Sequence, residues 1–345
     1  MREYKTMTEY KVICAEKKKR GGFSERIEEL SVSVARWLDQ EAAAGRRLRY
    51  SKVFLSDCLN QYEEYENSSL KRTLEVAPSA VIEQPPTDGC KIAVLLGSSD
   101  KPQNFILDCL RVSREEAEGI GAYEQTVALF EKYTEGIERQ GLEMKTHLVR
   151  TWIYVSDIDT NYQDVVRARN DIFARHGLTA DTHFIASTGI GGNTQERQAR
   201  VGIDFLTYPD IKETDKKYLR ALTHLNPTHE YGVAFERGTR LTLPGETVFY
   251  ISGTASINNK GKVVNEGDPV RQADRLLENI GALLANGGGT MDDIGYLIVY
   301  LRDFSDHEVI DNYMKQRFPQ TPYIIVLAKV CRPQWLIEME CVARR

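Results

Sequence analysis

The sequence predicts an α+β protein made of two similar domains, each a mixed sheet with helices packed on one face. Its 345 residues, 41% hydrophobic and 28% charged, are enough for two globular domains. Patterns typical of strands and helices follow one another in a similar order in both halves, and the halves match at an offset of 147. The matched positions are Gln125, Leu129 and Ile137 in the first half and Gln272, Leu276 and Leu284 in the second. We therefore expect an internal duplication, with a degenerate copy and an extra amino-terminal helix at 1–215 and a second copy at 216–345.

The first half combines amphipathic helices with short apolar strands. Its expected elements are a helix at 24–44, strands at 50–55, 71–76 and 90–99, a helix at 115–139, a strand at 147–155 and a helix at 162–175. The glycine-rich segment 187–192 lacks the Lys-Ser/Thr ending of a phosphate loop, so we expect a turn there. Segment 208–218, with a proline and a charge run, is expected to link the domains.

The second half repeats this order. We expect a strand at 249–257, a helix between Asp268 and Gly287, a strand at 294–301, a helix between Ser305 and Phe318, a strand at 323–330 and a terminal strand at 331–343. Because side chains alternate along a strand, Glu338 and Glu340 share one face with their carboxylates roughly 7 Å apart. Such a pair is either solvated or functional, and Cys331 with Arg332 adds a thiol and a cation just before it.

Composition excludes several classes of function. The net charge of −5 argues against a nucleic-acid partner held by a broad basic surface. The amino terminus has no apolar leader, and no stretch of 18 apolar residues occurs, so we expect neither export nor membrane insertion, but a cytoplasmic protein. The six cysteines and six histidines show no metal-ligand spacing, so no metal site is expected.

Motifs in the second half resemble the RidA/YjgF family. They are FYISGTASI at 249–257, YLIVYLRDFSDHEVIDNYMKQRFP at 296–319 and LIEMECVA at 336–343. The resemblance implies a chorismate-mutase-like fold and assembly as a homotrimer, or as a pseudo-symmetric ring, with ligand clefts between units. The imine-deaminating branch of the family carries an arginine two residues after the proline that matches Pro322, whereas this chain has Ile324.

The whole chain resembles the chorismatases, which act on chorismate. The motifs are RTWIYVSDI at 150–158, NPTHEYGVAFERG at 226–238, SGTAS at 252–256 and CRPQWLIEME at 331–340. The resemblance implies that Glu338 is the catalytic glutamate. It also matches Cys331 to the cysteine of the branch that makes 3-hydroxybenzoate, and it places Arg150, Arg237 and Ala255 near the pocket.

The residues fit this chemistry. Chorismate is a dianion with an enol ether, and breaking the ether requires a proton on its methylene carbon. A carboxylic acid of raised pKa can deliver it without a metal or redox cofactor, and Glu338 is the candidate. The two substrate carboxylates require cations or backbone donors. The candidates are Arg150, Arg237, Arg332 and the amides of Gly253, Thr254 and Ala255.

Each candidate also has a structural interpretation. Cys331 could be a packed thiol, Arg150 and Arg237 could form ordinary ion pairs, and Gly253 could serve only to permit positive φ. Two classes of function therefore stay open. The first is an enzyme that cleaves the enolpyruvyl ether to pyruvate and a hydroxybenzoate or a dihydrodiol. The second is a RidA-like protein that binds or deaminates small carboxylate or imine metabolites, which the departure from the chorismatase Arg-Tyr-Pro motif at 225–227 supports. Both imply a small anionic metabolite as partner, and neither a nucleic acid nor a membrane.

Overall fold

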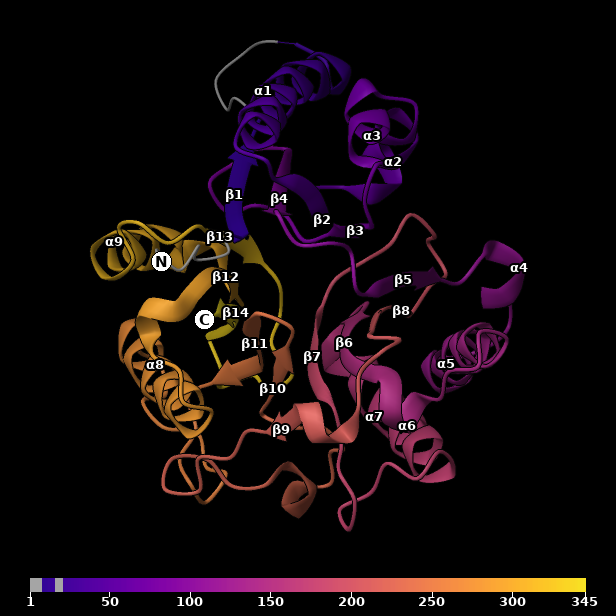
Figure 1. Cartoon of the computed structure of the whole chain (residues 1–345), viewed down its shortest axis with the longest axis vertical. Coiled ribbons are helices and arrows are strands. Elements are labelled where there is room, and N and C mark those ends of the chain that lie inside the picture. The colour runs from indigo at the N-terminus through magenta and orange to yellow at the C-terminus, as the bar shows by residue number, and fades with distance from the viewer. Residues whose placement is uncertain (1–7, 16–20) are drawn as a thin grey trace.

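The structure is a computed structural model that describes residues 8–15 and 21–345. The expectation about an amino-terminal leader falls largely on residues 1–7, which lie outside the described part. Within the described residues, three sheets surround a common centre and carry their helices on the outside (Figure 1). The predicted fold class, α+β with mixed sheets covered by helices on one face, is confirmed.

The first unit contains the four-stranded sheet β1-β4-β2-β3. Its elements are β1 (Thr8–Cys14), α1 (Phe23–Ala43), β2 (Arg47–Leu55), α2 (Cys58–Glu66), α3 (Ser69–Leu74), β3 (Ser79–Glu83) and β4 (Ile92–Ser99). Helix α1 forms because Ile27, Leu30 and Val34 recur at helical spacing, and all three are buried. They belong to a separate apolar core between this sheet and its helices.

The second unit contains the sheet β5-β8-β6-β7. Its elements are β5 (Ile106–Arg111), α4 (Arg114–Ala117), α5 (Ala122–Glu138), α6 (Met144–His147), β6 (Leu148–Val155), α7 (Ile158–Arg175), β7 (Ala186–Gly191) and β8 (Val201–Thr207). Helices α5 and α7 pack against each other and cover one face of this sheet (Figure 1). Phe130 on α5 meets both Phe173 on α7 and Phe205 on β8 edge to face, which fixes the helices on the sheet.

The third unit contains the six-stranded sheet β13-β12-β14-β11-β10-β9. Its elements are η1 (Glu213–Asp215), β9 (Lys216–Tyr218), η2 (Thr228–Tyr231), β10 (Gly238–Leu243), β11 (Glu246–Ala255), α8 (Pro269–Asn286), η3 (Met291–Asp293), β12 (Ile294–Leu301), η4 (Phe304–Asp306), α9 (His307–Arg317), β13 (Tyr323–Leu327) and β14 (Ile337–Arg344). Asp268 caps α8 by accepting a hydrogen bond from the Arg271 N–H, and Pro269 occupies the first turn, as the sequence predicts.

One strand order recurs in all three units. The first strand pairs with the last, the last with the second, and the second runs parallel to the third. The same pairing joins β5, β8, β6 and β7, and again β11, β14, β12 and β13. The described chain therefore contains three copies of one topology.

Two glutamines that the duplication matches have the same structural role. The Gln125 side chain donates to the Gln198 carbonyl and accepts from the Arg200 N–H. The Gln272 side chain donates to the Gln334 carbonyl and accepts from the Leu336 N–H. In both units a buried amide on the main helix thus holds the segment just before the last strand. A buried amide needs such partners, which explains why glutamine occurs at both positions.

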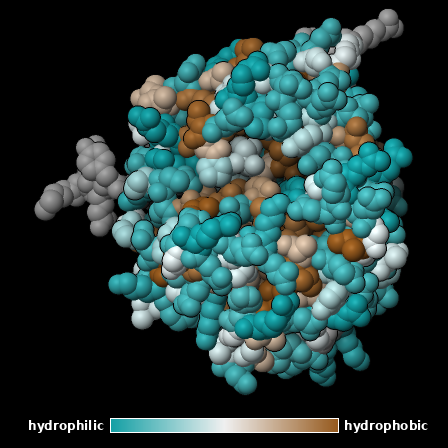
Figure 2. Space-filling view, turned by 90° about the vertical axis from the view of Figure 1, so that its right-hand side faces the viewer, coloured by the Kyte–Doolittle hydropathy of each residue, from teal (hydrophilic) through white to brown (hydrophobic). Residues whose placement is uncertain are grey.

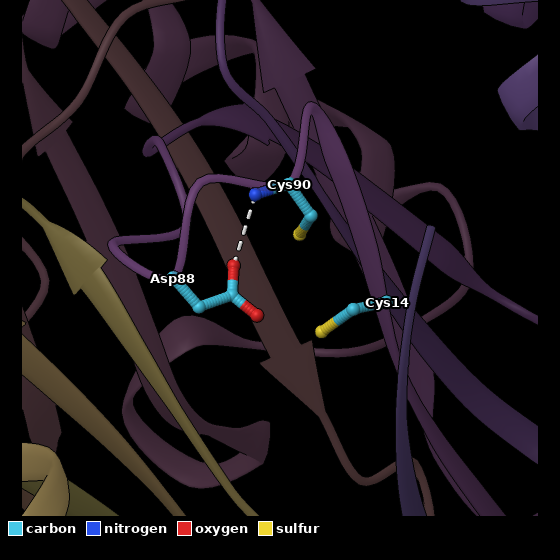
Figure 3. Close-up of side chains that lie close together, drawn as sticks. All are labelled: Cys14, Asp88 and Cys90. Carbon is cyan, nitrogen blue, oxygen red and sulfur yellow. Dashed lines mark hydrogen bonds between the residues drawn. The ribbon is translucent and has the colours of Figure 1, made fainter. Parts of the chain in front are cut away.

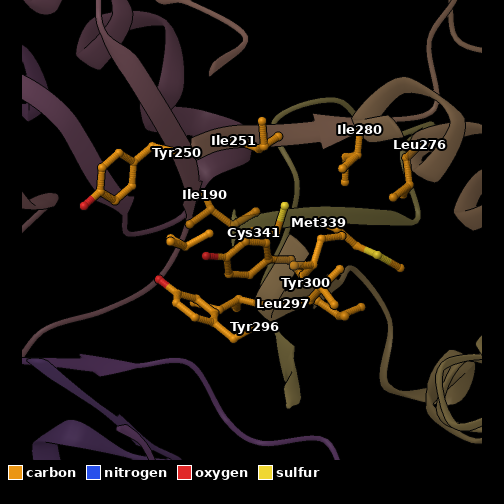
Figure 4. Close-up of a cluster of buried hydrophobic side chains, with 14 of the residues drawn as sticks. Ile190, Tyr250, Ile251, Leu276, Ile280, Tyr296, Leu297, Tyr300, Met339 and Cys341 are labelled. Atoms are coloured by element: carbon orange, nitrogen blue, oxygen red, sulfur yellow. The ribbon is translucent and has the colours of Figure 1, made fainter. Parts of the chain in front are cut away.

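The three units close into a ring. An isolated β-bridge crosses each junction: Glu83 with Asn193, Ala186 with Glu236, and Pro86 with Val326. The inner faces of the sheets meet in one apolar core that also extends under α8. In Figure 4, Ile190 of the second unit lies among side chains of the third, including Tyr300 and Met339. Each sheet thus has its outer face covered by its own helices and its inner face buried against the other units.

The expected domain at 1–215 contains two of these units. Strand β4, expected at 90–99, pairs with β1 and β2 and so completes the first unit. The second unit begins at β5. The sequence of the first unit does not reveal that it repeats the same topology. Its two short helices α2 and α3 lie where the second unit has the single helix α7. The boundary between 215 and 216 stays a prediction.

Three local predictions are wrong, and one holds only in part. Residues 71–76 do not form a strand, because Ser68 caps α3 by accepting from the Lys71 N–H. Segment 187–192 is largely strand β7, not a turn, because it pairs in parallel with β6. The segment expected to link the domains, 208–218, does join β8 of the second unit to the third unit, but its last residues form β9, which pairs with β10. The helix expected at 115–139 is divided into α4 and α5 near Gly119, whose φ is +73°.

The terminal strand is shorter than predicted. It begins at Ile337 rather than at residue 331, because the preceding segment turns over the sheet and Gln272 binds its Leu336 N–H. The remaining strand is almost completely buried. The alternative of a solvated carboxylate pair is therefore wrong: Glu338 is 5% exposed and Glu340 is 1% exposed.

The face of the molecule shown in Figure 2 is mostly hydrophilic, with hydrophobic side chains in small separate groups. Among the described residues, no helix combines the length and the apolar character that crossing a membrane requires.

Candidate active site

A cleft of about 380 Å³ lies at the junction between the second and third units. One wall comes from α7 and β7 of the second unit. The other comes from the third unit: β11, β14, the segment before β14 and residues 232–237 before β10. The lining residues include six of the predicted site residues, namely Glu338, Cys331, Arg237, Arg332, Gly253 and Ala255.

Glu338 is the second residue of β14 and pairs in register with Ala255 on β11. Burial raises the pKa of its carboxyl to about 8, with a further rise from the charge of Glu340, while Arg237 opposes the shift. A carboxyl group with such a pKa is largely protonated at neutral pH. Glu338 therefore reaches the cleft as a proton donor, in the state that general acid catalysis requires.

Gly253 makes room for this carboxyl group. A Cβ atom on Gly253 would lie 2.1 Å from Glu338 Oε1, which is far inside van der Waals contact. Gly253 does not have a positive φ, so the interpretation that the glycine serves only to permit positive φ is wrong. Its N–H instead donates to Thr188 Oγ1 at 2.9 Å across the junction. Glycine is required here for close approach.

Three guanidinium groups line the cleft. Arg237 donates to the Asn226 carbonyl at 3.2 Å and lies over the Phe235 ring. Arg332 donates to the Gly261 carbonyl at 3.2 Å and lies 4.7 Å from the Trp335 ring centroid. The third is Arg169 on α7, which is 2% exposed. Together they give the cleft a positive lining suited to an anionic ligand with two carboxylates.

Sequence reasoning missed Arg169. It lies on the buried side of α7 together with Val165 and Ile172. A charged residue inside an apolar helical stripe is unusual unless it is paired or functional, and this signal could have identified it. Because α7 belongs to the second unit, the cleft is formed by residues from both units.

Cys331 lies beside Tyr162, a cleft residue of α7 that sequence reasoning also missed. Both side chains line the cleft, and each influences the pKa of the other. Burial raises the pKa of Cys331 to about 12, and the nearby Glu338 contributes to the rise. Cys331 is therefore a neutral thiol at physiological pH and not a thiolate nucleophile.

Two predicted site residues lie outside the cleft lining. Arg150 is fully buried on β6, where it pairs with Glu340 at 3.0 Å and donates to the Ile251 carbonyl at 2.8 Å. The Thr254 hydroxyl donates to the Ser252 carbonyl and is 1% exposed. Arg150 therefore holds the second and third units together from inside the core, whereas the Thr254 contact lies within β11.

Glu340 differs from Glu338 although both share a face of β14. Burial by itself would raise the pKa of Glu340, but the charges of Arg150 and Lys52 outweigh it, so the pKa is lowered. Its Oε1 also accepts a hydrogen bond from Trp152 Nε1 at 2.7 Å. One carboxyl group is thus kept ionised in the core and the other is kept protonated in the cleft. Such a separation of two neighbouring pKa values is typical of acid–base sites.

Comparisons with known proteins agree with this architecture. The family described as Endoribonuclease L-PSP matches residues 238–345. The 3-aminoacrylate deaminase RutC of Acinetobacter baylyi is 31% identical over 101 residues, which cover 28% of this chain and 79% of RutC. A crystal structure of chorismatase matches 98% of both chains with a TM-score of 0.67 at 17% identity. RidA from an Antarctic Psychrobacter covers 37% of this chain at 19% identity with a TM-score of 0.31.

These matches cover different shares of the chain. The RutC match lies within one unit's length of sequence, whereas the chorismatase match extends over all three units and concerns the fold. Together with the recurrent topology, they establish that the chain belongs to the RidA/YjgF superfamily and has a chorismatase-like fold.

Proposed function

We propose that this protein is a chorismatase-like enzyme that cleaves the enolpyruvyl ether of chorismate, or of a related cyclic dicarboxylate. The products are pyruvate and a hydroxybenzoate or a dihydrodiol. One observation carries the proposal: a buried carboxyl group, Glu338, has a pKa raised to about 8 in a cleft lined by three arginines. The chorismatase-like fold of the whole chain supports it.

The proposed reaction begins with Glu338 as general acid. Its proton moves to the methylene carbon of the enol ether, and the ether oxygen stabilises the resulting cation. In the hydrolytic route, water adds to this cation, the hemiketal releases pyruvate and the dihydrodiol, and a proton returns to Glu338. Arg169, Arg237 and Arg332 bind the substrate carboxylates, while the buried walls exclude bulk water.

The direct test is to incubate the purified full chain with chorismate and measure pyruvate. We expect pyruvate together with either a hydroxybenzoate or a dihydrodiol. If no pyruvate is released, the chorismatase-like proposal fails. The second class of function, a RidA-like protein that binds or deaminates small metabolites, would then be tested by ammonia release from 2-iminoacids. Similarity to RutC favours this second candidate.

Activity should fall as pH rises through about 8. The pKa of Glu338 is raised to about 8 mainly by burial, so the carboxyl group is protonated below that pH and loses its transferable proton above it. The measurement is kcat/KM for pyruvate release as a function of pH, with a decrease of roughly tenfold per unit on the alkaline side. A profile that rises through the same range would contradict the assignment of Glu338 as the acid.

Cys331→Ala should change the ratio of products more than the total rate. The thiol is neutral and lines the cleft near Tyr162 and Glu338, so its removal changes the surroundings of the acid without removing the acid. The measurement is the amount of hydroxybenzoate and dihydrodiol formed for each pyruvate. A variant with an unchanged ratio and a rate as low as that of a Glu338 variant would show that Cys331 supports the chemical step itself.

We also propose that the three units of one chain replace the three subunits of a homotrimer. The reason is that the other units of the same chain already cover the inner face of each sheet.

A further inference from the structure

The junction between the first and third units is held by residues 84–90, between β3 and β4. The Thr87 N–H donates to the Ile325 carbonyl at 3.0 Å, and the Leu327 N–H donates to the Pro85 carbonyl at 2.8 Å. The Thr87 hydroxyl is also 2.7 Å from His307 Nδ1. This segment therefore ties the first unit to β13 and α9 of the third and closes the ring.

Three side chains with metal-binding atoms meet at the end of this segment (Figure 3). Cys14 is the last residue of β1, while Asp88 and Cys90 lie on the turn that leads into β4. Both sulfur atoms and a carboxylate oxygen all lie within 4.8 Å of one another. Cys90 is buried, whereas Cys14 is not. In the part of the chain that the structure describes, no other group of three such ligands is this compact.

The turn that presents Asp88 and Cys90 is well defined. Asp88 Oδ1 accepts a hydrogen bond from the Cys90 N–H at 3.0 Å, and Gly89 between them has a φ of +89°. The left-handed conformation at Gly89 sends both flanking side chains toward Cys14 (Figure 3). The arrangement is therefore set by the backbone rather than by the chance orientation of long side chains.

The cluster is an unusual place for ordinary packed thiols. The buried Cys90 thiol lies within 4.8 Å of both a carboxylate oxygen of Asp88 and the Cys14 thiol. An apolar environment would be enough for a cysteine that serves only as a small hydrophobic side chain. A divalent cation among the three groups would instead balance most of the negative charge of the carboxylate and both thiolates.

The identity of the ligands indicates which cation fits. Two thiolates are soft ligands and disfavour Mg²⁺ and Ca²⁺, which take oxygen. Zn²⁺ accepts sulfur at about 2.3 Å and carboxylate oxygen at about 2.0–2.2 Å, so its ligand atoms lie roughly 3.5–3.8 Å apart in a tetrahedron. Atoms that already lie within 4.8 Å of one another need only small movements to reach this geometry.

We propose that Cys14, Asp88 and Cys90 form a three-ligand site for Zn²⁺, with the fourth position taken by water. No spacing in the sequence indicates this site, because Cys14 is far from the other two ligands along the chain. The site links the end of β1 to the segment that closes the ring, so bound Zn²⁺ stabilises the junction between the first and third units. It is separate from the cleft of Glu338, which lies at another junction.

The test measures metal binding by the purified full chain in the presence of a non-thiol reductant. After removal of metal and dialysis against Zn²⁺, we expect one equivalent bound per chain. With Co²⁺ as a spectroscopic probe, we expect a thiolate-to-cobalt charge-transfer band and tetrahedral ligand-field bands. Zn²⁺ should also raise the midpoint of thermal unfolding of the metal-free protein.

Variants separate this site from non-specific binding. Cys14→Ser and Cys90→Ser should each weaken Zn²⁺ binding by about 100-fold or more, because even residues that only support metal ligands contribute about 10–100-fold. Cys14→Ser is the safer variant because Cys14 is not buried. Asp88→Asn should weaken binding less and keep the charge-transfer band. Cys109→Ser, a cysteine outside the cluster, is the matched control and should bind Zn²⁺ like the unmodified protein.

Three results would overturn the proposal. The first is no Zn²⁺ binding by the reduced protein. The second is binding that Cys14→Ser and Cys90→Ser leave unchanged. The third is a Cys14–Cys90 disulfide that persists under the reductant and prevents metal binding. Because the Glu338 cleft contains none of these ligands, pyruvate release does not enter the test, and failure of the proposed function would leave this inference intact.

Discussion

Glu338→Gln should lower turnover of chorismate by about 10² to 10⁴, the usual contribution of general acid catalysis. Glutamine keeps the shape of the side chain beside Gly253 but has no transferable acidic proton. Ligand binding should survive because the arginines of the cleft remain. The measurements are kcat for pyruvate release and the Kd of a hydroxybenzoate product. Full pyruvate release by this variant would show that another group protonates the substrate.

Stability provides an independent readout for the same variant. The folded-state pKa of Glu338 is raised from the model-compound value of 4.5 to about 8, so its contribution to stability is present at low pH and is lost as pH rises through about 8. Glu338→Gln has no ionised form to bury. We therefore expect its stability relative to the unmodified protein to increase between pH 4.5 and about 8 and to stay constant above. A variant that is inactive because it is misfolded would not behave in this way.

Glu340→Gln should destabilise the fold by about 3–5 kcal/mol, the usual cost of removing one partner of a buried ion pair. Arg150, fully buried and 3.0 Å from Glu340, would lose its counter-charge. The nearby Lys52 is also completely buried, and its Nζ lies 5.1 Å from the Trp152 ring centroid. The charge of Glu340 acts on Arg150 and on Lys52, and Lys52 is also influenced by Asp204. The measurement is the free energy of unfolding from denaturant titration.

Glu131→Gln is the matched control for this variant. Glu131 pairs with Arg175 at 3.4 Å, but both side chains are more than half exposed. An exposed pair contributes about 0–1 kcal/mol, so this substitution should change stability little. If Glu340→Gln is as mild as Glu131→Gln, the central cations must be neutralised by groups other than Glu340.

The two glutamates show how far sequence reasoning reaches. Strand alternation correctly places Glu338 and Glu340 on one face, because that depends only on the local backbone. Their opposite protonation states depend on neighbours from other units: Arg150 and Lys52 beside Glu340, and the walls of the cleft around Glu338. Alternation contains no information about these neighbours.

The arginines show the same limit. Arg237, which the resemblance placed near the pocket, and Arg332, which the substrate chemistry suggested, both line the cleft, but Arg150 does not. Its position in the motif RTWIYVSDI is on β6, and the inner face of that sheet points to the centre of the ring. Arg169 takes part in the cleft because α7 packs beside β7 at the junction. The packing of the units against each other therefore decides which arginines line the cleft.

The sequence by itself determined the α+β class, most helices and strands, the duplication of the second and third units, and Glu338 as the candidate acid. These follow from local periodicity and from motifs that are continuous along the chain. Only the tertiary structure decided that there are three units within the described residues, that they close into a ring, and that Cys14 meets Asp88 and Cys90. These features arise from contacts between residues far apart in the chain, whose energies depend on burial and charge that no local pattern specifies.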